Sequence, residues 1–205
     1  MMLSDSYAFQ DVYKFHRLIF VNSAAYAYTV IRVDKHTALC GQNNLGKTSM
    51  LNALKLFLLP HENFKSCSKK FAFKGPAGTY YSTEASFSYY FPENHSFIIL
   101  EAENMHGPFC LVLHRGNRPF SYGRMAVPCI YTDIQHLFWD LESPINGGMG
   151  APIDGISLSG VLSDLRARGG EAMNDGAVIR QRLFGQQALN REEGRFCLLP
   201  LRNGG

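Results

Sequence analysis

The stretch Thr37-Ala38-Leu39-Cys40-Gly41-Gln42-Asn43-Asn44-Leu45-Gly46-Lys47-Thr48 decides the fold that the sequence predicts. A short apolar run of the length of a buried strand ends at residue 41, and residues 41–48 match the pattern G-x-x-x-x-G-K-[ST]. Residues 49–59 are rich in Leu, Met, Ala and Lys and are followed by Pro60, which is typical of a helix. Strand, loop and helix in this order predict a phosphate-binding P-loop. The alternative is a chance glycine-rich turn ahead of a core helix.

Each part of this loop has a physical task in binding ATP and Mg²⁺. Glycines at positions 41 and 46 let the backbone approach phosphates in conformations that a Cβ would forbid. Loop amides and the start of the helix present donors and a partial positive charge to an anion. Lys47 supplies a charge to the β- and γ-phosphate oxygens, and the Thr48 hydroxyl is a ligand for Mg²⁺. The residues expected to line the ATP site are Gly41, Asn43, Asn44, Gly46, Lys47, Thr48 and Ser49.

The rest of the chain mixes strand and helix patterns. Residues 15–21 and 26–33 predict two strands, and residues 83–113 predict an antiparallel meander whose first strand alternates Ala85, Phe87, Tyr89 and Phe91. Residues 120–130 predict a further strand. Apolar residues at 158, 161, 162 and 165 predict an amphipathic helix over 158–168, ended by Gly169-Gly170.

Composition places the chain among ordinary globular proteins. Its 205 residues carry a net charge of +3, and its five cysteines are scattered without a C-x-x-C pair, which favours a reducing compartment. No stretch reaches the roughly 20 apolar residues of a membrane helix, so we expect a cytosolic protein. Basic residues gather at Lys65, Lys69, Lys70 and Lys74, and at Arg166, Arg168, Arg180 and Arg182. These clusters fit either a nucleic-acid contact or a solvated surface.

The first 54 residues resemble the start of an SMC-like ABC ATPase head. The resemblance rests on the early P-loop after two strands, on Asn43 within that loop, and on the helix sequence Ser49-Met50-Leu51-Asn52-Ala53-Leu54. That class includes the RecF, RecN and OLD-family ATPases. Within that class, three stretches are similar to the MukB/MksB/JetC condensin-like group: Phe20-Val21-Asn22, Leu58-Leu59-Pro60 and residues 179–185. The resemblance covers most of residues 15–185.

The resemblance implies an α/β fold, a P-loop NTPase of the ABC head type with an antiparallel β-meander subdomain after the P-loop helix. Residues 1–14 would be an arm and residues 15–142 the ATPase lobe with its β insertion. Residues 143–205 would be a linker and helical continuation toward a coiled coil and C-terminal lobe that the sequence does not contain.

The implied function is ATP-driven head dimerisation and hydrolysis that act on DNA, in condensation, loop extrusion, or plasmid or phage defence. The implied partners are a second ATPase head or the missing lobe, accessory subunits and DNA, without a membrane, in a cytoplasmic, nucleoid-associated complex. The rival reading is a self-contained P-loop NTPase, acting as a nucleotide switch or a kinase-like enzyme, with Glu101 or Asp133 as its own acid.

The resemblance also implies a Q-loop glutamine that contacts Mg²⁺ and the attacking water. Gln135 has the expected spacing from Lys47 and is our catalytic and metal-contacting candidate; Gln181 is the alternative, and each is also compatible with a surface amide. Glu101 ends the apolar run 97–100, either as a Walker B acid or as a solvent-facing residue of the meander. Ser157-Leu158-Ser159-Gly160 matches only the first part of an LSGGQ signature. ATPase activity would therefore require a partner or the C-terminal lobe.

Overall fold

The computed structural model describes residues 13–24, 26–34, 47–58, 82–104, 106–142, 150–153, 157–173 and 175. The strands are β1 (Tyr13–Ser23), β2 (Tyr26–Arg32), β3 (Phe97–Asn104), β4 (Gly107–Arg115), β5 (Tyr122–Val127), β6 (Trp139–Asp140), β7 (Ala151–Pro152) and β8 (Glu171–Ala172). The helices are α1 (Lys47–Leu58), α3 (Thr83–Tyr90), α4 (Tyr131–Ile134), the 3₁₀ turn η1 (Gln135–Leu137) and α5 (Leu158–Ala167).

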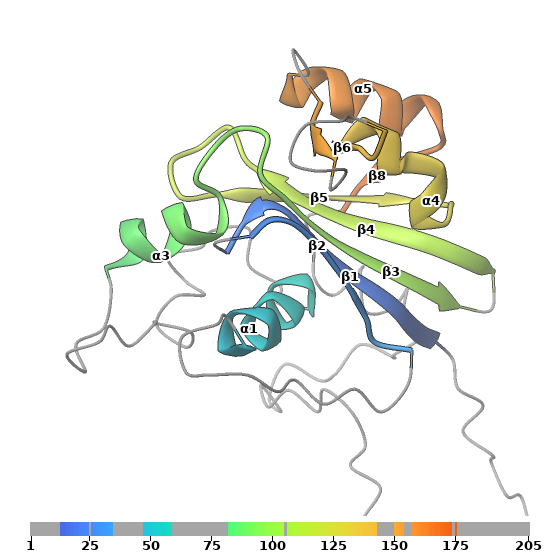
Figure 1. Cartoon of the computed structure of the whole chain (residues 1–205), viewed down its shortest axis with the longest axis horizontal. Helices are drawn as coiled ribbons and strands as arrows, with labels where there is room; N and C mark the ends of the chain where they lie inside the picture. The colour runs from blue at the N-terminus through green and yellow to red at the C-terminus, as the bar shows by residue number, and fades with distance from the viewer. Residues whose placement is uncertain are drawn as a thin grey trace, which may run out of the picture.

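One six-stranded sheet dominates the described part of the chain (Figure 1). Its strand order is β2-β1-β3-β4-β5-β8, and every neighbouring pair is antiparallel. The predicted α/β P-loop NTPase fold with a β-meander subdomain is therefore wrong. The strands on both sides of α1 in the sequence join a single sheet, because β1 pairs with both β2 and β3. The predicted strand at residues 37–40 lies outside the described residues.

The sheet buries both of its faces. One face packs against α1 and α3 through a core that includes Phe20, Phe57 and Phe87. The other face packs against α4, η1 and α5 through a core that includes Ile99 and Leu165. Figure 1 shows α1 on one side of the sheet and α4 and α5 on the other. Such double coverage explains why β3 and β4 are almost continuously apolar instead of alternating.

Residues 83–90 form the helix α3, so the predicted first strand of the meander is wrong. The Ser82 side chain accepts a hydrogen bond from the Ala85 amide, and Glu84 lies in the first turn, both of which favour a helix start. The buried side chains Ser86, Phe87 and Tyr90 recur at helical spacing. The alternation of Phe87, Tyr89 and Phe91 was misleading because Tyr90, which lies between two of them, is buried as well.

Most other local predictions are confirmed. The strands predicted at 15–21 and 26–33 are β1 and β2, the helix predicted after the P-loop pattern is α1, and the strand predicted within 120–130 is β5. The later strands of the predicted meander are β3 and β4. The helix α5 ends as expected: Gly169 has a φ of 84° and the Gly170 amide donates to the Leu165 carbonyl.

Candidate functional site

The helix α1 begins at Lys47, inside the P-loop pattern. Its first amides have no carbonyl partner within the helix, so they are available to an anion that approaches the helix start. Gly41, Asn43, Asn44 and Gly46 lie outside the described residues, as do the side chains of Lys47 and Thr48. Of the predicted phosphate site, the structure describes the backbone from the start of α1 onward.

Ser49 is buried at this helix start, and its hydroxyl lies 3.1 Å from the Tyr89 hydroxyl. The Tyr89 hydroxyl in turn donates to the Ala24 carbonyl at the β1–β2 turn. Ser49 is thus part of the packing between α1 and α3. Its hydroxyl has a protein partner in addition to any role at a nucleotide.

Tyr90 fixes the same turn of α1 from the next position along α3. Its hydroxyl donates to the Ser49 carbonyl at 3.2 Å and is also hydrogen-bonded to the Asn52 side chain. Burial raises the pKa of Tyr90, so the phenol stays protonated and remains a donor. Tyr89 and Tyr90 were missed as positioning residues because their segment was predicted as a strand.

Gln135 lies on the other face of the sheet. It belongs to η1, whose Leu137 packs in the core shared with α4 and α5, whereas α1 packs on the opposite face. The Gln135 amide donates to the Tyr28 hydroxyl at 2.8 Å, and Tyr28 also meets the Tyr131 hydroxyl at 3.2 Å. The structure does not bring Gln135 to the described start of α1. Gln181 lies outside the described residues.

Glu101 is buried in β3 and does not face solvent as the meander reading expected. Its side chain is 5% exposed, and its Oε2 lies 3.2 Å from the Arg17 Nε. The two charges attract at this distance, but Oε2 makes no hydrogen bond because the N–H does not point at it. Asp133 is an exposed residue of the first turn of α4. Arg32, the last residue of β2, pairs with Asp34 at 2.6 Å.

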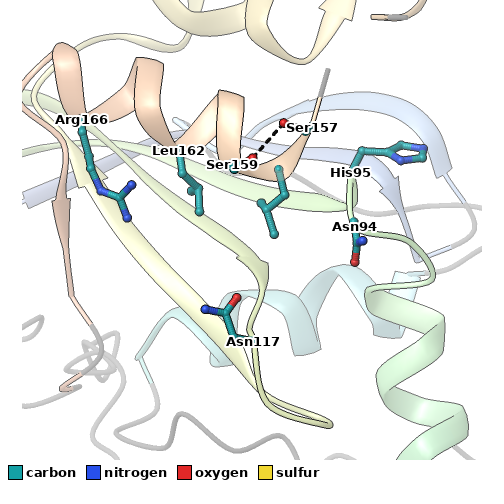
Figure 2. A pocket seen from close by; sticks show the side chains of 8 residues that line it. Asn94, His95, Asn117, Ser157, Ser159, Leu162 and Arg166 are labelled. Atoms are coloured by element: carbon teal, nitrogen blue, oxygen red, sulfur yellow. Dashed lines mark hydrogen bonds between the residues drawn. The ribbon is translucent and has the colours of Figure 1, made fainter. Parts of the chain in front are cut away.

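A groove of about 630 Å³ lies between the start of α5, the turn before β3 and the loop between β4 and β5 (Figure 2). Arg166 and Leu162 point from α5 toward Asn117 of that loop. Ser157 caps α5 and accepts from the Gly160 amide, while its hydroxyl also meets that of Ser159 at 2.9 Å. On the rim, His95 pairs with Glu93 at 2.5 Å.

A second hollow of about 350 Å³ adjoins this groove and shares Asn117, Leu162 and Arg166 with it. It adds Arg118 from the exposed loop and the buried Arg124 of β5. Among the described residues, no carboxylate lines either hollow. Burial, together with the nearby charge of Arg166, lowers the pKa of His114, so this imidazole is neutral near pH 7. We call the two hollows together the arginine groove.

The described residues show neither a metal-binding cluster nor a membrane-spanning helix. No group of three or more His, Cys, Asp or Glu side chains there is placed to hold a metal ion. Within the same part of the chain, no helix has the length and apolar character needed to cross a membrane.

Comparison with protein families assigns the chain. The family model described as "Putative Mks condensin complex protein MksF" matches residues 8–125, more than half of the chain. The matched region contains β1 to β4, α1, α3 and most of β5. The chain therefore belongs to the MksF family. No curated protein and no solved structure matched the chain.

The family agrees with the condensin-like group that the sequence resembles. It does not test the narrower assignment to an SMC-like ATPase head, which stays a prediction.

Proposed function

We propose that this chain is the ATP-binding component of a condensin-like complex that organises DNA in the cytoplasm. One observation carries the nucleotide part of the proposal: α1 begins at Lys47, within a complete G-x-x-x-x-G-K-[ST] pattern. Family membership supports the condensin-like part, since the family is described by its place in an Mks complex.

In this proposal the amides at the start of α1 hold the phosphates and Lys47 neutralises their charge. Thr48 supplies a ligand for Mg²⁺. The packing of Tyr89 and Tyr90 on Ser49 supports the binding, because it fixes the first turn of α1 before nucleotide arrives. Gln135 is left out of this site because it lies on the opposite face of the sheet.

The Lys47→Ala substitution tests this site in the full chain. We expect it to weaken ATP binding by calorimetry at least about tenfold, or about 1.4 kcal/mol, because the phosphate oxygens lose their loop cation. Lys55→Ala, two turns further along the same helix, is the matched control and should leave the affinity unchanged. Equal affinity for ATP in the Lys47→Ala variant and the parent chain would remove the P-loop assignment.

A second observation favours a DNA contact at the arginine groove. Arg118 and Arg166 line it without a lining carboxylate among the described residues, and the Asn117 amide adds a donor. We propose that it contacts the phosphate backbone of DNA. Arginine, amide and hydroxyl donors of this kind position a protein on DNA without reading its sequence.

The Arg166→Gln substitution tests the groove. We expect weaker binding to duplexes of unrelated sequence, and a salt dependence of log K that is shallower by about one unit, because one phosphate contact is lost. Lys14→Gln is the control, because it also removes one positive charge but lies at the opposite end of the sheet, where Lys14 of β1 is opposite Glu103 of β3. It should leave the affinity for DNA and its salt dependence unchanged. An unaltered salt slope in the Arg166→Gln protein would mean that the groove does not contact DNA.

A further inference from the structure

A row of polar side chains crosses the apolar sheet face that is covered by α4 and α5. Arg17 of β1 is opposite Glu101 of β3, and Glu101 is opposite Cys110 of β4. Cys110 is in turn opposite Val127 of β5, two residues before Cys129. Cys110 and Val127 belong to the core on this face of the sheet, and Cys129 packs against that core from just beyond the end of β5.

The backbone after β5 bends at this point. The Cys129 amide donates to the Val127 carbonyl at 2.9 Å, a contact between residues i and i+2 that closes a tight turn. The thiols of Cys110 and Cys129 are hydrogen-bonded to each other. Cys110 is completely buried, whereas Cys129 is only partly buried. Cys129 is therefore the more accessible residue of the pair.

The environment makes the two thiols chemically unequal. The hydrogen bond from Cys110 lowers the pKa of Cys129, and Arg168 acts in the same direction, against the opposing effects of burial, Asp133 and Glu101. The same hydrogen bond, burial, and the charges of Cys129 and Glu101 raise the pKa of Cys110, and Arg17 only partly offsets them. Cys129, the less buried residue of the two, is thus also the one that is more readily a thiolate, which is the form that reacts.

We propose that Cys110 and Cys129 are an oxidation site that closes into an intramolecular disulfide on reaction with a peroxide. This modification is independent of the proposed binding of nucleotide and DNA. It would join β4 covalently to the segment that enters α4.

The reaction proceeds in two balanced steps. The Cys129 thiolate attacks one oxygen of hydrogen peroxide, the O–O bond breaks, and Cys129 becomes a sulfenic acid while hydroxide leaves. The Cys110 sulfur then attacks the Cys129 sulfur, the S–O bond breaks, and the Cys110 proton leaves with the hydroxyl group as water. The two sulfurs lose two electrons in total and the peroxide gains them. A dithiol reductant reverses the change by thiol–disulfide exchange.

The decisive protein is the full chain with Cys40→Ser, Cys67→Ser and Cys197→Ser, which keeps only the proposed pair. After peroxide treatment and alkylation, mass spectrometry is expected to show an unalkylated monomer that has lost two hydrogens. A dithiol reductant should restore two alkylatable thiols. If this variant fails to fold, peptide mapping of the oxidised parent chain gives the same answer, because the linked peptides contain Cys110 and Cys129.

Two single variants separate the roles of the sulfurs. In Cys110→Ser, a sulfenic acid should accumulate at Cys129 and be trapped by dimedone. In Cys129→Ser, Cys110 should remain a free thiol at the same peroxide dose. The proposal is overturned if the three-serine variant keeps both thiols, if Cys129 proceeds to the sulfinic acid beside a free Cys110, or if the disulfides link separate molecules.

Discussion

At the scale of single residues, one buried arginine ties the sheet to α1. Arg124 of β5 is fully buried, and its guanidinium donates to the Leu56 carbonyl at 3.0 and 3.3 Å and to the Tyr122 hydroxyl at 2.9 Å. It also lies 4.7 Å from the centre of the Tyr122 ring. A cation beside the carbonyls of the last helical turn is favourable, so Arg124 stabilises the end of α1 opposite its proposed phosphate site.

The Arg124→Lys substitution is expected to lower the free energy of unfolding by about 2 kcal/mol. A lysine keeps the charge buried but cannot reproduce the fork of hydrogen bonds and the ring contact. The measurement is urea unfolding of both proteins. Arg118→Lys, at an exposed loop position, is the control and should change stability by no more than about 0.5 kcal/mol. A stability of Arg124→Lys equal to the parent would mean that the guanidinium contacts do not stabilise the fold.

At the scale of elements, α3 shows how a cap decides between helix and strand. Its aromatic residues suit either structure, and its sequence alternates as a strand does. Ser82 selects the helix because its hydroxyl accepts the Ala85 amide at 3.1 Å, which satisfies a donor that the helix itself leaves unpaired. The choice has a consequence at a distance, because Tyr89 and Tyr90 reach Ser49 of α1 only from this helix.

Removing this cap with Ser82→Ala should cost about 1 kcal/mol of stability. The midpoint of chemical unfolding is expected to fall to a lower denaturant concentration. The slope of the free energy of unfolding against denaturant concentration should stay the same, since the surface buried on folding does not change. Ser88→Ala, at an exposed position within α3, should have little effect or a slightly favourable one. Equal losses in the two variants would show that the Ser82 hydroxyl does not act as a cap.

At the scale of the whole molecule, the described fold is an antiparallel sheet covered on both faces, with the proposed nucleotide site on one face. Gln135, the sequence-based candidate for positioning the attacking water, lies on the other face with Tyr28 and Tyr131. The buried Glu101 faces Arg17 on that second face as well. None of these three residues is placed beside the described start of α1.

The purified chain alone is therefore expected to bind ATP with negligible Mg²⁺-dependent turnover. A phosphate-release assay with the parent chain and Lys47→Ala side by side measures this, and the two rates should both equal the background. Turnover that the parent shows and the Lys47→Ala variant lacks would favour the self-contained NTPase. In that case, Glu101→Gln and Asp133→Asn identify whether either acid takes part.

The sequence by itself determined the local elements whose signals lie within a few residues. Two strands, the helix after Lys47 and the glycine-ended helix α5 follow from side-chain period, helix caps and glycine. It also indicated the condensin-like group, because the resemblance is carried by short stretches of consecutive residues such as Phe20-Val21-Asn22. It gave the wrong structure for α3, which the alternation of aromatic residues predicted as a strand, and it gave no sign that Tyr89 and Tyr90 meet Ser49.

Only the tertiary structure decided how the elements combine. The sequence pattern of a strand does not indicate which other strand it pairs with. Here β1 pairs with β3, which follows α1 in the sequence, and the result is one antiparallel sheet instead of the predicted α/β fold. Coverage of the two sheet faces by different helices separated Gln135 from α1, and the pairing of β4 with β5 placed Cys110 beside the segment that contains Cys129. The physical reason is that backbone hydrogen bonds between strands are alike at every register, so burial of both sheet faces selects the pairing.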